Sequence, residues 1–211
     1  MSDEKKPVVA FTMFTPYMII DIGRIENFAG DIIDAPPVAS LCRCGESKNR
    51  PFCDGSHSLN GINGEKEPDR VPYRWKDYLG EKITVHFNLN VCSHDGSCVR
   101  MLPEVFNINC RPWITPDNGD TEAIINVIKH CPSGALSYTL NGKRHTDYYN
   151  GEPKLRITKR GPLEFYGGII LKDDQGSKPE TYDHYALCRC GHSKNKPFCD
   201  GKHLKFRFSG S

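Results

Sequence analysis

The sequence has few hydrophobic residues and little net charge of either sign. Hydrophobic residues make up 37% of the 211 residues, while glycine and proline number 19 and 15. A globular domain usually has a larger apolar share, and small loop-rich units commonly need disulfides, metals or association for stability. The formal net charge of +2 excludes a whole-molecule field that would attract nucleic acid or a membrane surface. We therefore expect neither of them as a partner.

The sequence also lacks an apolar run long enough to cross a bilayer. Its most apolar stretch, residues 8–20, is 13 residues long and is interrupted by Thr12, Thr15 and Pro16. A spanning helix needs about 20 apolar residues, and the acids before Lys5 do not suit a signal peptide. We predict strand structure here and a cytoplasmic location. Cysteines in that reducing compartment bind metal more often than they form disulfides.

No arrangement typical of an enzyme is recognisable. The sequence has no Ser/His/Asp order with a nucleophile elbow, no glycine-rich phosphate loop and no paired-carboxylate site. The reactive residues that remain are chiefly its 10 cysteines and 8 histidines. The sequence therefore predicts a metal-binding protein that is not an enzyme.

A segment of 17 residues occurs twice. Residues 41–57, LCRCGESKNRPFCDGSH, and residues 187–203, LCRCGHSKNKPFCDGKH, differ at three positions and lie 146 residues apart. The same offset relates residues further upstream, so the duplication covers roughly residues 8–60 and 154–206. In both copies short β segments with Gly, Asp and Pro turns precede the cysteines.

The segment between the copies has a different pattern. Residues 82–88, KITVHFN, alternate as in a half-buried strand, and residues 135–140, ALSYTL, predict a closing strand. Between them a helix is expected to begin at Asp120 or Thr121 as its N-cap and to end before Pro132. Its apolar face would consist of Ala123, Ile124, Val127 and Ile128. This middle segment is predicted to be a compact α+β unit.

Each copy has three cysteines and one histidine at metal-ligand spacing. These are Cys42, Cys44, Cys53 and His57, and then Cys188, Cys190, Cys199 and His203. Three thiolates and an imidazole can form a closed zinc site, or they can hold an iron–sulfur cluster. The Cys-X-Cys spacing favours the cluster, because residues i and i+2 of an extended chain point to one side and suit two ligands on one iron.

Basic residues accompany both sets of ligands. We expect these side chains to be exposed, either simply solvated or able to orient an acidic partner: Arg43, Lys48, Arg50, Arg189, Lys194 and Lys196.

The spacing Cys-X-Cys-X2-Ser-X3-Pro-X-Cys-Asp-Gly-X-His resembles the CDGSH iron–sulfur domain family, that of mitoNEET. Both copies match it without a gap, although Lys202 replaces the small residue of the family pattern. The resemblance implies a 2Fe–2S cluster in each copy, with the Cys-X-Cys pair on the inner iron and the third cysteine and the histidine on the outer one. It also implies that a first unit, residues 8–66, and a second unit, residues 154–208, pair as an internal pseudo-dimer.

The middle domain, residues 70–142, has a third set of cysteines. Cys92 and Cys98 enclose Asp95 in the run CSHDGSC, and Cys131 precedes a proline. This segment resembles the divergent single-cluster (4Fe–4S mono-cluster type) ferredoxin family, which implies one cluster held by the three cysteines. Asp95 stands where a bacterial ferredoxin has its second cysteine. Because carboxylate is a poor ligand for this iron, we favour 3Fe–4S over a 4Fe–4S cluster that also uses Asp95.

Four other residues of the middle domain could be mistaken for ligands. Cys110 is expected to be a small buried thiol. The three histidines are expected to have surface or packing roles, and they are His86, His94 and His130.

The sequence thus predicts an α+β protein with two small β-rich CDGSH units and an inserted ferredoxin-like domain. Its leading function is electron transfer between redox partner proteins through two 2Fe–2S clusters and one 3Fe–4S or 4Fe–4S cluster. The alternatives are transfer or storage of clusters for apo iron–sulfur acceptors, a redox or pH-stress sensor, and a zinc-stapled interaction module.

Overall fold

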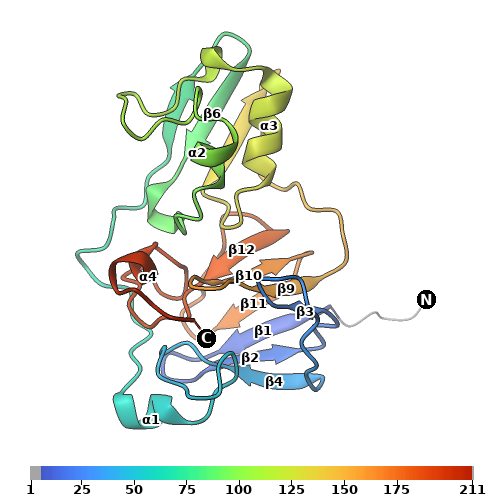
Figure 1. Ribbon diagram of the computed structural model, residues 1–211, viewed down its shortest axis with the longest axis vertical. Coiled ribbons are helices and arrows are strands. Elements are labelled where there is room, and N and C mark those ends of the chain that lie inside the picture. The colour runs from blue at the N-terminus through green and yellow to red at the C-terminus, as the bar shows by residue number, and fades with distance from the viewer. Residues whose placement is uncertain (1–5, 211) are drawn as a thin grey trace.

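The computed structural model describes residues 6–210, and within them the strands form three four-stranded sheets. Two sheets lie next to each other in one half of the molecule, and the third lies with α2 and α3 in the other half (Figure 1). Within these residues no helix is long and apolar enough to cross a membrane. With three sheets and few helices, the structure is of mixed α+β type and rich in sheet, as predicted.

The first sheet takes three strands from the first unit and one from the second. Its order is β11-β1-β2-β4. The strands are β1 (Val8–Phe11), β2 (Tyr17–Ile20), β4 (Val38–Leu41) and β11 (Ile170–Asp173). β1 and β11 run parallel, with Val9 opposite Leu171, and the other pairs are antiparallel.

The second sheet has the reverse composition. Its order is β12-β10-β9-β3, and only β3 belongs to the first unit. The strands are β9 (Lys154–Ile157), β10 (Leu163–Tyr166), β12 (His184–Leu187) and β3 (Ile25–Glu26). β3 and β9 run parallel, with Ile25 opposite Leu155. Adding 146 to the numbers of Val9 and Ile25 gives Leu155 and Leu171, so this pairing is the counterpart of the pairing of β1 with β11. Each unit thus lends an edge strand to the other.

Alternating side chains of these strands form the core between the two units. Tyr17 and Ile19 of β2 are buried while Met18 between them is exposed, which is the period of two expected for strands, and Leu163 and Phe165 of β10 are buried as well. The hydroxyl of Tyr17 crosses to the second unit and donates to the carbonyl oxygen of Cys188 at 2.9 Å. The stretch of residues 8–20 is thus a pair of strands, as the sequence predicted.

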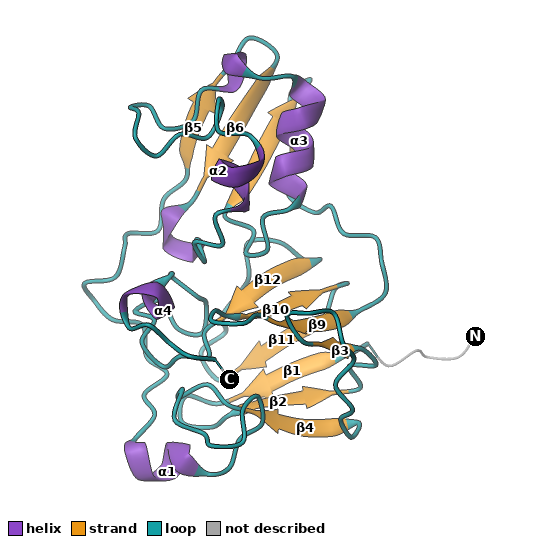
Figure 2. Ribbon diagram, viewed as in Figure 1, coloured by secondary structure: helices purple, strands orange, loops and turns teal. Residues whose placement is uncertain are grey.

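The middle domain is a sheet covered by a helix. Its strands, in the order β5-β6-β7-β8, are β5 (Lys76–Leu79), β6 (Ile83–Phe87), β7 (Leu136–Leu140) and β8 (Lys143–His145). The α-helices of the described residues are α1 (Ser56–Asn60), α2 (Ser97–Met101), α3 (Thr121–Lys129) and α4 (Lys202–Lys205). Two short 3-10 helices, η1 (Leu89–Val91) and η2 (Pro116–Asn118), complete the domain (Figure 2).

The helix α3 begins as predicted, with Asp120 as its N-cap. The carboxylate of Asp120 accepts from the backbone N–H groups of Glu122 and Ala123, which satisfies two donors of the first turn. Ile124 and Ile128 are completely buried against the sheet. Burial of each such side chain contributes roughly 1.5–3 kcal/mol to stability. Ala123, predicted to lie on the apolar face, is only half-buried, and Ile125 is buried in addition.

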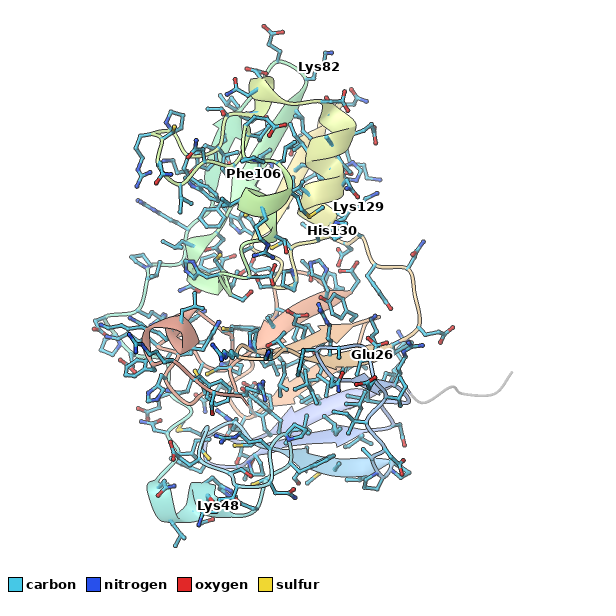
Figure 3. All side chains as sticks on the ribbon, viewed as in Figure 1. Glu26, Lys48, Lys82, Phe106, Lys129 and His130 are labelled. Atoms are coloured by element: carbon cyan, nitrogen blue, oxygen red, sulfur yellow. The ribbon has the colours of Figure 1, made fainter. Side chains whose placement is uncertain are left out.

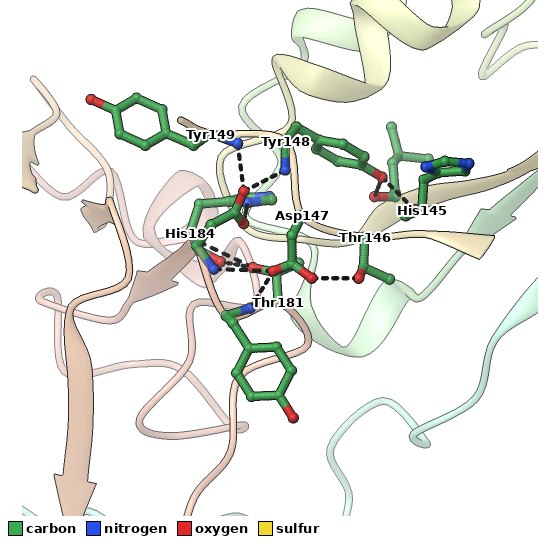
Figure 4. A network of polar contacts seen from close by, with 10 residues as sticks. His145, Thr146, Asp147, Tyr148, Tyr149, Thr181 and His184 are labelled. Carbon is green, nitrogen blue, oxygen red and sulfur yellow. Dashed lines mark hydrogen bonds and ion pairs between the residues drawn. The ribbon is translucent and has the colours of Figure 1, made fainter. Parts of the chain in front are cut away.

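Two aspartates fix the chain that leaves the middle domain onto the second unit. Asp147 accepts from the backbone N–H groups of Tyr182 and Asp183, at 2.6 and 3.1 Å. In return, Asp183 accepts from the backbone N–H groups of Tyr148 and Tyr149 (Figure 4). This reciprocal pair, which we call the aspartate clasp, holds the polar segment that follows β8 in a defined path.

Candidate metal centres

In each CDGSH copy, backbone hydrogen bonds bring the ligand-bearing segments together. The N–H of Cys42, just after β4, donates to the carbonyl of Pro51 at 2.9 Å, and the N–H of Cys53 donates to the carbonyl of Ser40 at 2.8 Å. The equivalent bonds of the second copy are 2.8 and 3.0 Å long. The Cys-X-Cys segment and the third cysteine are therefore side by side in both the first loop, residues 42–57, and the second loop, residues 188–203.

The four predicted ligands of each loop lie in two pairs. In the first loop, the sulfur atoms of Cys42 and Cys44 are 3.7 Å apart, and the sulfur of Cys53 is 3.2 Å from Nδ1 of His57. The second loop repeats this arrangement with distances of 3.6 and 3.4 Å. Among residues 6–210, no three His, Cys, Asp or Glu side chains converge on a point where one ion would bind. Three thiols and an imidazole brought together in this way are a donor set that suits iron.

Within each inner pair the surroundings favour the ligating form of one cysteine, Cys42 or Cys188, while the same sulfur–sulfur hydrogen bond raises the pKa of the other, Cys44 or Cys190. The pKa of Cys42 is lowered to about 6, chiefly by a hydrogen bond from the thiol of Cys44 and also by the backbone N–H groups of Cys44, Gly45 and Ser47. The equivalent groups lower the pKa of Cys188 to about 6 as well. Because the thiolate is the metal ligand, this loop backbone is suited to a bound iron centre.

Asp54 shapes the second half of the first loop. Its carboxylate accepts from the N–H of Lys48 at 2.8 Å and from the N–H of Ser56 at 3.0 Å, and Asp200 makes the same bonds in the second loop. The helix α1 starts at Ser56 with Gly55 as its N-cap, so Asp54 lies one residue before the cap. Gly55 has a φ of 87°, which favours glycine.

Two of the basic residues predicted to be exposed are buried instead. Arg43 and Arg189 are each 3% exposed. The guanidinium of Arg43 donates to the carbonyls of Thr12 and Thr15, at 3.0 and 3.3 Å, and stands against the ring of Phe11. The guanidinium of Arg189 likewise donates to the carbonyls of Thr158 and Gly161. The prediction was wrong because carbonyls far away in the sequence satisfy these donors, so neither arginine is available to orient a partner.

The two loops meet back to back through glycine. A β-carbon at Gly45 would come within 2.6 Å of the carbonyl oxygen of Cys190, and one at Gly191 would overlap the carbonyl of Cys44. Each glycine thus allows the backbone of one ligand loop to contact the backbone next to a ligand in the other. The two inner donor pairs are consequently adjacent.

The predicted ligands of the middle domain also come together. Cys92, Cys98 and Cys131 line one small pocket, whose walls include Phe87 and Trp113. Burial, followed by the charge of Cys131, raises the pKa of Cys92 to about 12 and that of Cys98 to about 11. In this apolar pocket the thiolate forms need a cationic centre to neutralise them, which fits an iron cluster held by three cysteines.

Asp95 and Cys110 differ from these three. Asp95 also lines the pocket, but its carboxylate accepts from both the N–H and the hydroxyl of Ser97 and lies 3.5 Å from the guanidinium of Arg100. Cys110 does not line the pocket, and it is exposed rather than buried as predicted. It lies on a surface loop near the exposed Ile108.

The three histidines of the middle domain have different surroundings. His86 is buried and hydrogen-bonds to Asp77 and Thr139 at 2.7 Å each, while His130 is exposed. These are the packing and surface roles predicted. His94 also has a surface and packing role, since it is exposed and its ring lies so close to Gly201 that a β-carbon there would overlap it. The ligand loop of the middle domain therefore contacts the second CDGSH loop, beside its Cys199–His203 pair.

Comparisons with known proteins agree with these sites. The family model described as iron-binding zinc finger, CDGSH type, matches residues 15–58 and 160–204, and the one described as divergent 4Fe-4S mono-cluster matches residues 78–141. The uncharacterized protein YjdI of Escherichia coli, in strains K12 and O157:H7, is 48% identical over 64 residues, which are 30% of this chain and 84% of that protein. No solved structure matches the chain. The matched ranges lie inside the predicted domains, whose exact bounds stay predictions.

Proposed function

The chain belongs to the iron-binding CDGSH family, with a divergent 4Fe-4S mono-cluster domain between its two CDGSH domains, and on this premise we propose that it carries single electrons between protein partners. Iron–sulfur clusters, when bound, take up and release one electron at a time. The residues of this chain hold, order and shield the sites. We propose a carrier rather than an enzyme.

The cluster types follow from the donor sets. We assign a 2Fe–2S cluster to each CDGSH loop, since its ligands stand as two pairs. For the middle domain we favour 3Fe–4S, because it offers three thiols and the carboxylate of Asp95 is engaged by Ser97 and Arg100. The alternative there is a 4Fe–4S cluster with Asp95 as its fourth ligand.

The two CDGSH units are proposed to act as an internal pseudo-dimer. The reciprocal edge strands support this, because β11 extends the first sheet and β3 extends the second in the same parallel register. The glycine contacts between the two loops support it as well.

The observation that carries electron transfer, rather than storage alone, is the order of the three sites. His94 brings the middle site against the Cys199–His203 pair, and the glycine contacts join the two inner pairs. The sites thus form a continuous row from the middle domain to His57. A row of this kind suits movement of electrons through the molecule.

Electron paramagnetic resonance (EPR) on anaerobically purified protein tests the proposal. We expect reversible reduction by dithionite, two 2Fe–2S signals, a three-iron signal in the oxidised protein, and about seven iron atoms per chain. Asp95→Cys should supply a fourth thiolate, replace the three-iron signal and raise the iron content by about one atom. Cys110→Ser serves as the control, because that thiol is exposed outside the pocket. Clusters that cannot be reduced and reoxidised without loss would contradict a carrier.

The partial exposure of one ligand pair favours a second function. This function is transfer of clusters to apo iron–sulfur acceptors, or sensing of redox or pH stress. Cys53 and His57 are only half-buried, whereas Cys199 and His203 are buried. Incubation with an apo-ferredoxin separates the functions. Fast loss of the first cluster to the acceptor would favour transfer, and retention would favour the carrier.

A further inference from the structure

The two CDGSH loops have almost the same sequence, but only the second is covered by other parts of the chain. Lys194, Asn195 and Gly201 of the second loop correspond to Lys48, Asn49 and Gly55 of the first, each 146 residues earlier. We call these last three residues the open face. The contacts of the covered face show which chemical groups suit such a face.

The lysine of the covered face is held by carboxylates. The ammonium group of Lys194 lies 3.4 Å from a carboxylate oxygen of Glu67 and is also paired with Asp69. The backbone N–H of Glu67 donates to the carbonyl of Lys194 at 2.8 Å, and Lys66 forms a β-bridge with Asn195. A segment with two carboxylates, Glu67 and Asp69, is therefore the first component that covers the loop.

The asparagine and the glycine of the covered face contact the middle domain. Asn195 is 3% exposed, and its amide donates to the backbone oxygen and the side-chain oxygen of Asn90 at 2.9 and 2.7 Å. The ring of His94 lies on Gly201. The cluster loop of a ferredoxin-type domain is thus the second component.

None of these contacts exists on the first loop. Lys48 and Asn49 are exposed, and their side chains make no hydrogen bond or ion pair within residues 6–210. A β-carbon at Gly55 would meet no other heavy atom within 4 Å. Leu59 on the neighbouring helix α1 is 89% exposed. Lys48 and α1 lie at the end of the molecule opposite the middle domain (Figures 1 and 3).

We propose that the open face is the docking surface for a separate, acidic ferredoxin-type protein, which takes on the first loop the place that the middle domain takes on the second. The partner would supply a carboxylate for Lys48, an amide or carbonyl group for Asn49, and the edge of its cluster loop over Gly55. This inference rests on the proposed electron transfer, since docking there places the partner's cluster beside the Cys53–His57 pair.

The test is a binding titration of the cluster-loaded, full-length protein with a purified acidic bacterial single-cluster ferredoxin, by calorimetry at low salt. We expect saturable binding that weakens as salt is added, because salt screens exposed charges. The double variant Lys48→Glu with Asn49→Asp should raise the dissociation constant by roughly tenfold or more, through like-charge repulsion. Lys129→Glu is the matched control, since this exposed lysine lies on α3 at the other end of the molecule (Figure 3).

The outcomes are distinct. Equal effects of the two charge reversals, or absence of binding at low salt, would overturn the docking surface. The docking surface would also be overturned if Arg100→Glu weakened ferredoxin binding and the Lys48→Glu, Asn49→Asp variant did not, since that result would assign docking to the middle domain. Concentration-dependent self-association that Lys48→Glu abolishes would identify a second copy of this chain as the occupant and refute a ferredoxin. Reversible dithionite reduction is followed in parallel: if it persists while docking fails, only this inference is lost, and if it fails, so does the proposed function.

Discussion

Glu164 is a carboxyl group inside the second CDGSH unit, far from any predicted ligand in the sequence. It is 1% exposed on β10, accepts from the hydroxyl of Tyr166 at 3.1 Å and lies 3.5 Å from the guanidinium of Arg156. Burial raises its pKa from 4.5 to about 7, although Arg156 opposes this. Ionisation of this residue therefore costs folding free energy at neutral pH.

We predict that Glu164→Gln removes a pH dependence of stability. Because the pKa is higher in the folded than in the unfolded chain, the contribution of Glu164 is fully present below pH 4.5 and is lost as pH rises through 7. The shift corresponds to about 3 kcal/mol. Denaturant unfolding of the two proteins at pH 5 and pH 8 measures it. The variant should gain more stability relative to the native protein at pH 8 than at pH 5, and a constant difference across pH would contradict the assignment.

At the residue scale, the sequence predicts which cysteines and histidines come together better than it predicts their surroundings. Three cysteines and a histidine at fixed spacing are recognisable without a structure, and the structure brings the members of each set into pairs. The burial of Arg43 and the contact of His94 with Gly201 were not predictable. Both depend on which distant backbone a side chain meets, and no local pattern records that.

At the scale of elements, α1 and α4 have nearly the same sequence context but different surroundings. His57 on α1 is half-buried beside an open face, whereas His203 on α4 is 6% exposed and lies near the ring of His94. Burial is the main cause that lowers the pKa of His203. A histidine with a lower pKa stays neutral, and thus able to bind iron, to lower pH.

We therefore predict that the first cluster is lost before the second as the pH falls. His57→Cys should delay the first loss and His203→Cys the second, because a thiolate replaces the protonatable imidazole. The visible absorption of anaerobic protein, followed during slow acidification, measures both losses. Unchanged acid lability in both variants would show that protonation of histidine is not the cause.

The predictable elements are those with local patterns. The alternation of residues 82–88 and the capped apolar face of α3 predict a strand and a helix that the structure confirms. The family resemblance implied a pseudo-dimer but not the exchange of β3 and β11, because pairing partners far apart in sequence have no local pattern. The two-residue strand β3 is also too short to be recognised from alternation.

At the scale of the whole molecule, the aspartate clasp determines how the chain returns from the middle domain to the second unit. Each of its carboxylates binds two backbone N–H groups of the other segment (Figure 4). Asp183 is half-buried and Asp147 is exposed, so loss of one of these hydrogen bonds costs typically about 0.5–1.5 kcal/mol.

We predict that Asp147→Ala loosens this connection and speeds protease cleavage within residues 146–153 several-fold, because local opening becomes easier. Limited proteolysis with mass spectrometry identifies the cut. Asp31→Ala is the control, since this exposed aspartate bonds only within its own turn. Equal cleavage rates in the two variants would mean that the clasp does not restrain the segment.

The exchanged strands also determine the order in which the sheets can form during synthesis on the ribosome. The edge partner of β1 is β11, which is translated about 160 residues later, while the strands of the middle domain pair among themselves. The middle domain can thus fold as it emerges, but the first sheet stays incomplete until nearly the whole polypeptide has been made. A ribosome that stalls before residue 170 leaves a nascent chain with β1 uncovered and in need of protection from aggregation.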